Sequence, residues 1–341
     1  DVEQTVEAVE VNERTIIGDV LDHATADIAR LDLLEKLATL LETLFLDQFT
    51  TRNNDVLPLG IDLQDLKIVR LANILVEVLR RLDVDLPDGT VAYKVNAGQT
   101  GFYRVAYQDE ANLAALGDRV RNRTLGAEDR WGLQNDLFAQ VRQGRLPMGD
   151  YLAFLDHYSE ERAFLPLISI TANLYQAYLV LPQDQRPAVV DAGRRLATAA
   201  LDPVGLQPVD GEPHTTATLR DQLIWRAAVW GAGAVTDAAA ECFDRMMAGE
   251  AVPADIARSV MQVGARTRGK DALSWFCQRF LETPNEHERM NLLIAMGGFD
   301  NWTLTAEALA FTLEKVPARN RFMPIVAAAA NPWAIAHLWD W

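Results

Sequence analysis

Apolar residues recur along most of this chain at the three- and four-residue spacing of amphipathic helices. One such stretch begins near Thr15, and a second begins after Asp62, a residue that suits a helix N-cap. The two apolar faces consist of Leu33, Leu34, Leu37, Leu40, Leu41, Leu44 and Phe45, and of Leu66, Val69, Leu71, Ile74, Leu75, Val78 and Leu82. This pattern predicts two or three helices between residues 15 and 82. We expect their leucine faces to pack as a bundle, on a neighbouring domain or on a second copy of the chain.

The pattern changes between residues 91 and 107, where β-branched and aromatic residues flank a glycine-rich centre. Residues that favour strands, on either side of residues that tolerate positive φ, predict two short strands and a turn. The strand-forming residues are Tyr93, Val95, Phe102, Val105 and Tyr107, and the centre is Ala97-Gly98-Gln99-Thr100-Gly101. We therefore expect a β-hairpin over residues 89–108.

Helical patterns of moderate length then follow one another to the end of the chain, separated by short turn signals. Helices joined by short loops, with no strands between them, are antiparallel neighbours. The turn signals lie at 144–147, Pro182, 206–213, 249–253, 267–269, 283–284 and 331–332. The sequence shows no strict repeat, but its rhythm of helix pairs predicts a mainly α fold in which residues 109–341 form a HEAT- or armadillo-like α-solenoid.

Charge divides the chain near Pro87-Asp88-Gly89. Residues 1–88 contain 8 Lys+Arg and 19 Asp+Glu, a net charge of −11, and the remainder contains 24 and 29, a net of −5. We therefore expect three parts: an acidic helical segment (1–88), the hairpin (89–108) and the helical repeat domain (109–341). The negative charge argues against binding to nucleic acid, whose phosphates require Lys and Arg.

The remaining composition is that of a water-soluble protein. No apolar run reaches the roughly 18 residues that a membrane-spanning helix needs, so we expect no membrane association. The two cysteines, Cys242 and Cys277, each lie within an apolar helical stretch. This position favours buried, reduced thiols over a disulfide, and it predicts a cytoplasmic protein.

Several motifs between residues 91 and 341 carry a family resemblance. They are Val95-Asn96, Gln99-Thr100-Gly101, Phe102-Tyr103-Arg104-Val105 and Tyr107; the helix from Leu125 to Ala139 (LGAEDRWGLQNDLFA) with Gly144-Arg145-Leu146; then Trp225-Arg226, Gly264, Thr283-Pro284 with Glu286 and Glu288-Arg289, and Ala330-Asn331-Pro332. In this order they resemble the last strands of the β-sandwich and the C-terminal helical domain of M1-family zinc aminopeptidases. Residues 1–88 show no such resemblance.

The resemblance implies a concave helical cap. In the family this domain covers the zinc site and limits which peptides reach it, while the residues that break bonds lie in another domain. The chain stops at Trp341, where the family's helix continues for several more turns. We therefore expect a non-catalytic C-terminal fragment of an M1-type metallo-aminopeptidase, a hydrolase, whose partners are peptides or the missing catalytic domain. Residues 15–82 are candidates for self-association.

The chemistry of that family is absent from this sequence. Its catalysis needs His-Glu-x-x-His, in which two imidazoles bind zinc and the glutamate activates water, and a Gly-x-Met-Glu-Asn strand that holds the substrate amine. The nearest stretch is His287-Glu288-Arg289-Met290-Asn291, with a poor zinc ligand at its last position. Glu286 and Glu288 are better explained by the dipole of a helix that begins near Thr283. We predict no catalytic residue, metal ligand or cofactor in this chain, and zinc in the catalytic domain of the parent.

Six residues are candidates for the domain junction or for the lining of a peptide channel: Tyr103, Arg104, Asp129, Arg130, Asn135 and Asp136. For Arg104 we favour an ion pair with a carboxylate at the junction, because its planar guanidinium fixes geometry well. The four helical residues are either surface ties or part of the concave face.

A different class of function fits the same pattern. An α-solenoid offers a long concave surface to peptides or proteins, and a peptidase-like shell can exist without the chemistry. The alternative is therefore a stand-alone interaction scaffold without peptidase activity. The coding sequence before Asp1 discriminates between the two.

Overall fold

The computed structural model describes residues 85–101, 103–338 and 340–341. The helices expected between residues 15 and 82, and their self-association, lie outside the described residues. The chain divides into two units after Val91, and the second unit is Ala92–Trp341. The division into 1–88, 89–108 and 109–341 stays a prediction.

The second unit is built from helices, which confirms the mainly α fold class. The helices are α5 (Glu110–Arg121), α6 (Ala127–Arg142), α7 (Met148–Leu155), α8 (Phe164–Val180), α9 (Arg186–Val204), α10 (His214–Val229), α11 (Gly233–Met247), α12 (Ala257–Arg268), α13 (Lys270–Glu282), α14 (Glu286–Ala295), α15 (Trp302–Lys315), α16 (Phe322–Ala329) and α17 (Ile335–Leu338). In this part of the chain no helix is long and apolar enough to cross a membrane.

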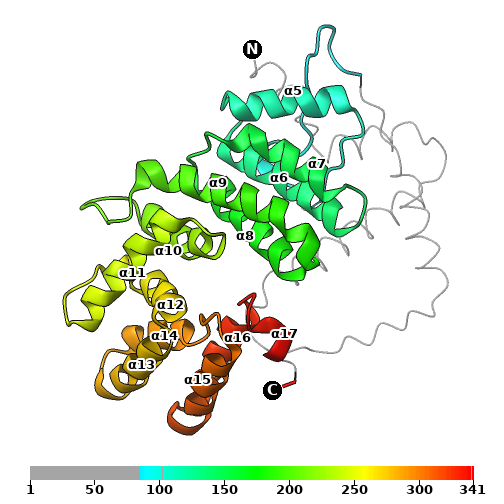
Figure 1. The fold of residues 1–341 in the computed structure, drawn as a ribbon. Helices are drawn as coiled ribbons and strands as arrows, with labels where there is room; N and C mark the ends of the chain where they lie inside the picture. The colour runs from blue at the N-terminus through cyan, green and yellow to red at the C-terminus, as the bar shows by residue number, and fades with distance from the viewer. Residues whose placement is uncertain (1–84, 102, 339) are drawn as a thin grey trace, which may run out of the picture. The chain divides into compact units, whose positions relative to one another are not determined.

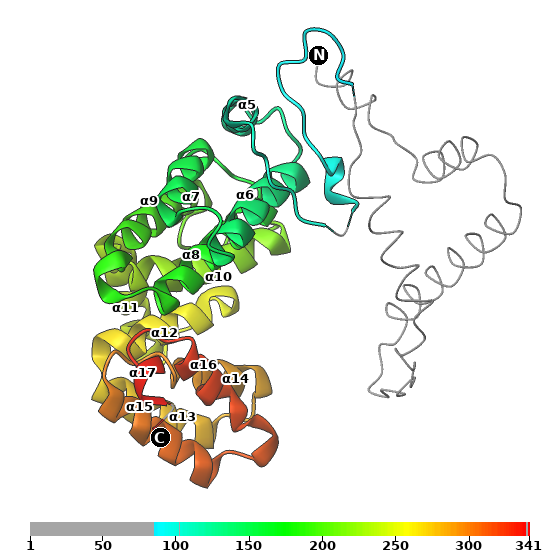
Figure 2. The same ribbon diagram turned by 90° about the vertical axis from the view of Figure 1, so that its right-hand side faces the viewer.

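The helices form two layers. The even-numbered helices from α6 to α16 pack each on the next, and the odd-numbered helices lie along the other side: α9 contacts α8 and α10, α11 contacts α10 and α12, and α13 contacts α12 and α14. Figures 1 and 2 show the stack in chain order, from α6 and α7 to α13 and α15. Such a succession of helix pairs is the arrangement expected of an α-solenoid.

The even-numbered layer encloses a hollow. The hydroxyl of Tyr175 on α8 donates to the carbonyl of Ala330, which ends α16, at 2.8 Å. A cavity of about 420 Å³ lies between these helices, and its lining includes Trp225, Arg226 and Met323. The end of α16 therefore lies close to α8, although Tyr175 and Ala330 are far apart in the sequence.

Aromatic side chains pack between the two layers of helices. Two of them lie directly against glycines, which have no side chain in the way. Trp230 and Phe243 are fully buried. Gly193 on α9 lies under the ring of Trp230, and Gly264 on α12 lies under that of Phe243, so that a Cβ at Gly264 would be 2.3 Å from the Phe243 ring. Interiors packed at this density tolerate no added atom at such a contact without a shift of helix or ring.

The two cysteines are free thiols. Cys242 is buried, whereas Cys277 is only half-buried. Burial raises the pKa of the Cys277 thiol to about 11, so this sulfur is protonated and unreactive at neutral pH.

The β-hairpin expected over 89–108 is not formed in the described residues of that segment. They are irregular except for a 3₁₀ turn, η1 (Ala97–Gln99). Asn96, Gly98 and Gln99 have φ of 57°, 67° and 56°, which curls the centre of the segment. The Asn96 side chain accepts from the N–H of Gly101 (2.7 Å) and donates to its carbonyl (3.0 Å). The Asn96 side chain thus bonds to the backbone N–H and carbonyl of Gly101, which a partner strand would bond in a hairpin. Asparagine side chains readily form such bonds in turns.

The packing of Gly264 gives a stability prediction. Gly264→Ala should lower the free energy of unfolding by about 1–3 kcal/mol, because the new methyl overlaps the Phe243 ring. Gly149→Ala in α7 is the matched control, since a Cβ there meets no atom within 4 Å. The control should be neutral or gain up to about 1 kcal/mol from helix propensity. Denaturant unfolding measures both, and equal midpoints for the two variants would contradict the described contact.

Candidate functional site

Helix α6 carries four of the six predicted site residues, and its outer stripe holds the segment before α5. Asp129, Gly132, Asp136 and Gln140 recur at three- or four-residue spacing and so lie on one face of the helix. Each of the four contacts a residue between 94 and 105. The helix therefore binds this segment along much of its length.

The first contacts are made at the N-terminal end of α6. Asp129 accepts a hydrogen bond from the backbone N–H of Gly98 at 2.8 Å and pairs with the Lys94 ammonium at 3.0 Å. One turn further, the Gln99 side chain lies over Gly132, where a Cβ would be 2.0 Å from the Gln99 amide carbon. A Cβ at position 132 would therefore displace the Gln99 side chain from the surface of α6.

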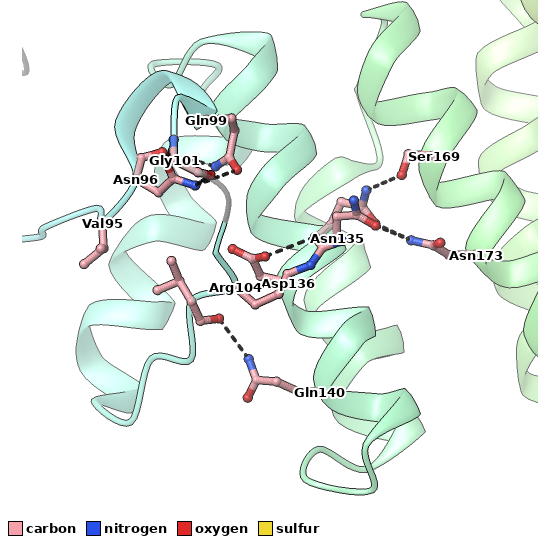
Figure 3. Close-up of polar contacts among 12 residues, drawn as sticks. Val95, Asn96, Gln99, Gly101, Arg104, Asn135, Asp136, Gln140, Ser169 and Asn173 are labelled. Carbon is pink, nitrogen blue, oxygen red and sulfur yellow. Dashed lines mark hydrogen bonds and ion pairs between the residues drawn. The ribbon is translucent and has the colours of Figure 1, made fainter. Parts of the chain in front are cut away.

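Arg104 and Asp136 make the central contact. Nη1 of Arg104 lies 3.2 Å from Oδ1 of Asp136, and Figure 3 shows the pair between the segment and α6. The Asp136 side chain is 5% exposed and that of Arg104 is 56% exposed. The next helical turn adds Gln140, which donates to the carbonyl of Val105 at 3.3 Å. The guanidinium thus covers a buried carboxylate from the solvent side, while Tyr103 beside it is exposed.

Burial controls the ionisation of Asp136. It raises the pKa of this carboxyl, and the charge and hydrogen bond of Arg104, together with the backbone at Val105, oppose that rise. The folded chain therefore holds the Asp136 proton more tightly than the unfolded chain does. Among side chains, Arg104 does most to offset the cost of burying the charged form of Asp136.

Another face of α6 is tied by Arg130 to the connection between α7 and α8. Its guanidinium donates two hydrogen bonds to the carboxylate of Glu161, from Nε to Oε2 at 2.6 Å and from Nη2 to Oε1 at 2.9 Å. Both side chains are buried. Burial opposes ionisation of Glu161, but Arg130 and the N–H of Ala163 outweigh it and hold the pKa of the carboxyl below its ordinary value. The hydroxyl of Tyr158 donates to the Arg130 carbonyl at 2.6 Å. Arg130 is therefore part of the interior.

Asn135 belongs to an amide cluster centred on Gln134, which is fully buried. Gln134 donates to Ser169 Oγ at 2.9 Å and accepts from Tyr151 and from Asn173, each at 3.0 Å. Nδ2 of Asn173 also lies 3.5 Å from Oδ1 of Asn135 (Figure 3). This cluster joins α6 to α7 and α8.

Sequence reasoning missed several residues of this site: Lys94, Asn96, Gly132, Gln134 and Gln140. Gln134 offered a signal in the sequence, because it lies one helical turn after Arg130 and on the same face of the helix. If that face is buried, both polar side chains need hydrogen-bond partners. Asn112 is a further example, since its side chain accepts from the N–H of Tyr93 (2.8 Å) and donates to its carbonyl (3.1 Å). No spacing in the sequence indicates such pairing of a side chain with a distant backbone group.

The described residues contain no cluster of three or more His, Cys, Asp or Glu that could hold a metal ion. At the stretch resembling a zinc motif, Glu288 is held by Arg279 with hydrogen bonds of 2.6 and 3.0 Å. Asn285 caps α14 through the N–H groups of His287 and Glu288. On α6, Asp129 and Asp136 are paired with Lys94 and Arg104 of the preceding segment, so this arrangement can hold a segment in place. Whether Tyr103, Arg104 or Asn135 also lines a channel stays a prediction.

The Arg104–Asp136 pair gives a second prediction. Arg104→Ala should lower the free energy of unfolding at neutral pH by about 1–3 kcal/mol, because it leaves a buried carboxylate without its cation. Arg104→Lys should recover only part of this. Arg104→Ala combined with Asp136→Asn should be more stable than Arg104→Ala alone, and denaturant unfolding of the set measures the coupling.

The same pair predicts a pH dependence. Because the pKa of Asp136 is raised in the folded state, its contribution favours folding at low pH and is lost as pH rises through the folded pKa. Removing Arg104 raises that pKa further. The stability difference between wild type and Arg104→Ala should therefore be small in acid and grow towards neutral pH. A difference that is constant with pH would mean that Asp136 is not the partner that matters.

Comparison with known proteins agrees with this architecture. The model of the family described as ERAP1-like C-terminal domain matches residues 92–341. The chain is similar to Aminopeptidase 2, mitochondrial, of Saccharomyces cerevisiae, with 24% identity over 268 residues, which is 77% of this chain and 28% of that protein. It is also similar to Aminopeptidase M1 of Arabidopsis thaliana, with 26% identity over 240 residues, or 67% of this chain and 27% of that protein.

A shorter stretch is more similar to an archaeal protein. The Tricorn protease-interacting factor F2 of Thermoplasma acidophilum is 36% identical over 93 residues, 27% of this chain and 12% of that protein. The chain thus spans between about an eighth and just over a quarter of the length of these curated relatives. The family match covers well over half of the chain and includes both the segment bound to α6 and the two-layered stack. The chain belongs to the ERAP1-like C-terminal domain family.

Proposed function

We propose that residues 92–341 act as the helical cap of an M1-type aminopeptidase. In this proposal the cap encloses an active site carried by another part of a longer protein and limits which peptides reach it. The observation that carries the proposal is the family match over the whole second unit, together with relatives that are named aminopeptidases.

The geometry of the second unit supports a cap. A cap must keep a fixed angle to whatever precedes it, and the stripe on α6 holds residues 94–105 through ion pairs and hydrogen bonds instead of leaving them as a free linker. A cap must also present a hollow face, and the cavity among the even-numbered helices provides one. Peptides are then the molecules that this face would meet.

The cofactor and location belong to the same proposal. Zinc would be bound by a His-Glu-x-x-His helix in the catalytic part, and the residues of the helical unit would shape the chamber without touching the metal. We also propose a cytoplasmic location for the parent. A stand-alone scaffold is the less favoured alternative, because the relatives that match the same region are named aminopeptidases.

The test compares the chain with its parent protein. The purified 341-residue chain should bind no stoichiometric zinc and should not cleave aminoacyl-anilides, because it lacks the ligand set. The coding sequence before Asp1 should encode His-Glu-x-x-His and Gly-x-Met-Glu-Asn, and the whole protein should show chelator-sensitive cleavage.

A matched pair of variants sharpens the test. In the whole protein, replacing a histidine of the upstream His-Glu-x-x-His with alanine should abolish cleavage, whereas His287→Ala should leave it unchanged. One tightly bound zinc per 341-residue chain, with chelator-sensitive activity, would overturn the proposal. A parent gene without either catalytic motif would favour the scaffold instead.

A further inference from the structure

A second cavity lies away from α6, among helices α11 to α14 and the loop between α11 and α12. Its volume is about 600 Å³, which lies in the range of binding pockets for small molecules and side chains. The stretch His287–Asn291, which in sequence resembles a zinc motif, supplies part of its wall. Three residues of this stretch, His287, Glu288 and Asn291, therefore face a cavity.

The apolar part of the lining is rich in methionine. Met246, Met247 and Met261 line the cavity together with Trp275. Met261 is buried, and the other three are half-buried. Methionine side chains are unbranched and polarizable, so a surface made of them adapts to apolar groups of different shapes. This lining suits an apolar side chain without demanding one particular residue.

Asn291 is the most deeply buried polar residue in this wall. The residue is 6% exposed, and its side-chain amide has no hydrogen bond to any described residue. Its neighbours are engaged: Glu288 with Arg279 and Thr283, and Gln278 with Glu282 at 2.8 Å. The amide therefore reaches the cavity and can bond to a ligand there. An amide that both donates and accepts is the natural complement of a peptide group.

The charges around the cavity favour a cation. Glu250 and Glu282 line it and are exposed to solvent. Arg279, a cation in the same lining, is already neutralised by Glu288. The two exposed glutamates therefore leave a net negative charge at the mouth, which attracts lysine or arginine and repels acidic segments.

We propose that this cavity binds an internal segment of a linear peptide or protein that carries an apolar side chain next to a lysine or arginine. The apolar side chain lies among the three methionines and Trp275. A peptide group of the segment pairs with the amide of Asn291, and the basic residue lies near Glu250 and Glu282. The site needs neither a free N-terminus nor a free C-terminus, so it is independent of any aminopeptidase chemistry.

The probe is a tripeptide with blocked ends, acetyl-lysyl-leucyl-lysine amide, titrated into the full chain by calorimetry. Acetyl-glutamyl-leucyl-glutamate amide tests the charge, and acetyl-lysyl-seryl-lysine amide tests the apolar side chain. We expect the first peptide to bind with one site and the other two at least about tenfold more weakly. Equal binding of all three, or no binding of the first, would overturn the proposal. Equally tight binding of spermidine would also overturn it, since charge alone would then suffice.

Variants of the chain locate the site. Asn291→Leu, of similar volume, should weaken binding of the first peptide about tenfold. Its thermal midpoint should be unchanged or higher, because no hydrogen bond is lost on substitution. A clear fall in the midpoint would show that the amide serves the fold instead and would count against the proposal.

Two exposed positions keep the test independent of the stability of Asn291→Leu. Glu282→Gln should weaken binding about two- to fivefold. Glu314→Gln, which changes an exposed carboxylate on α15 that pairs with Lys315, should not weaken it. Ala257→Phe, which places a ring in the cavity from α12, should abolish binding. Binding that survives Ala257→Phe would place the peptide elsewhere on the chain and refute the assignment.

Discussion

Two buried carboxylates, Asp136 and Glu161, set the position of helix α6, and each is matched by one arginine from another part of the chain. Asp136 meets Arg104 on the outer side of α6, and Glu161 meets Arg130 on the inner side. A buried carboxylate without its cation is costly, so these pairs restrict how α6 can rotate or slide. The segment before α5 and the connection between α7 and α8 are thereby held to the same helix.

The helices were predictable because their apolar spacing depends on local sequence, and the start of α14 was predictable from its turn signal and acidic first turn. The hairpin was not. Strand residues define a strand only when another strand supplies the hydrogen bonds, and here the side chains of Asn96 and Asn112 supply them. For Arg104 a carboxylate partner could be expected, but its identity as Asp136 depends on the rotation of α6, which no sequence pattern specifies.

The stretch His287–Asn291 shows how one sequence can suggest chemistry that its surroundings do not provide. Spacing along a helix places side chains on a common face, but their partners decide their role. Glu288 is committed to Arg279, and Asn285 caps the helix. The amide of Asn291 and the methionines that line the same cavity supply groups suited to recognition instead.

The contact between Tyr175 and Ala330 has a consequence for the order of folding. Most contacts in the stack join helices that are neighbours in sequence, and such local contacts form quickly. The hydrogen bond from Tyr175 spans 155 residues, so the entropy of closing that long loop is recovered only after the helices between have packed. We therefore expect the contact between α8 and the end of α16 to form late, after the helices between them have packed.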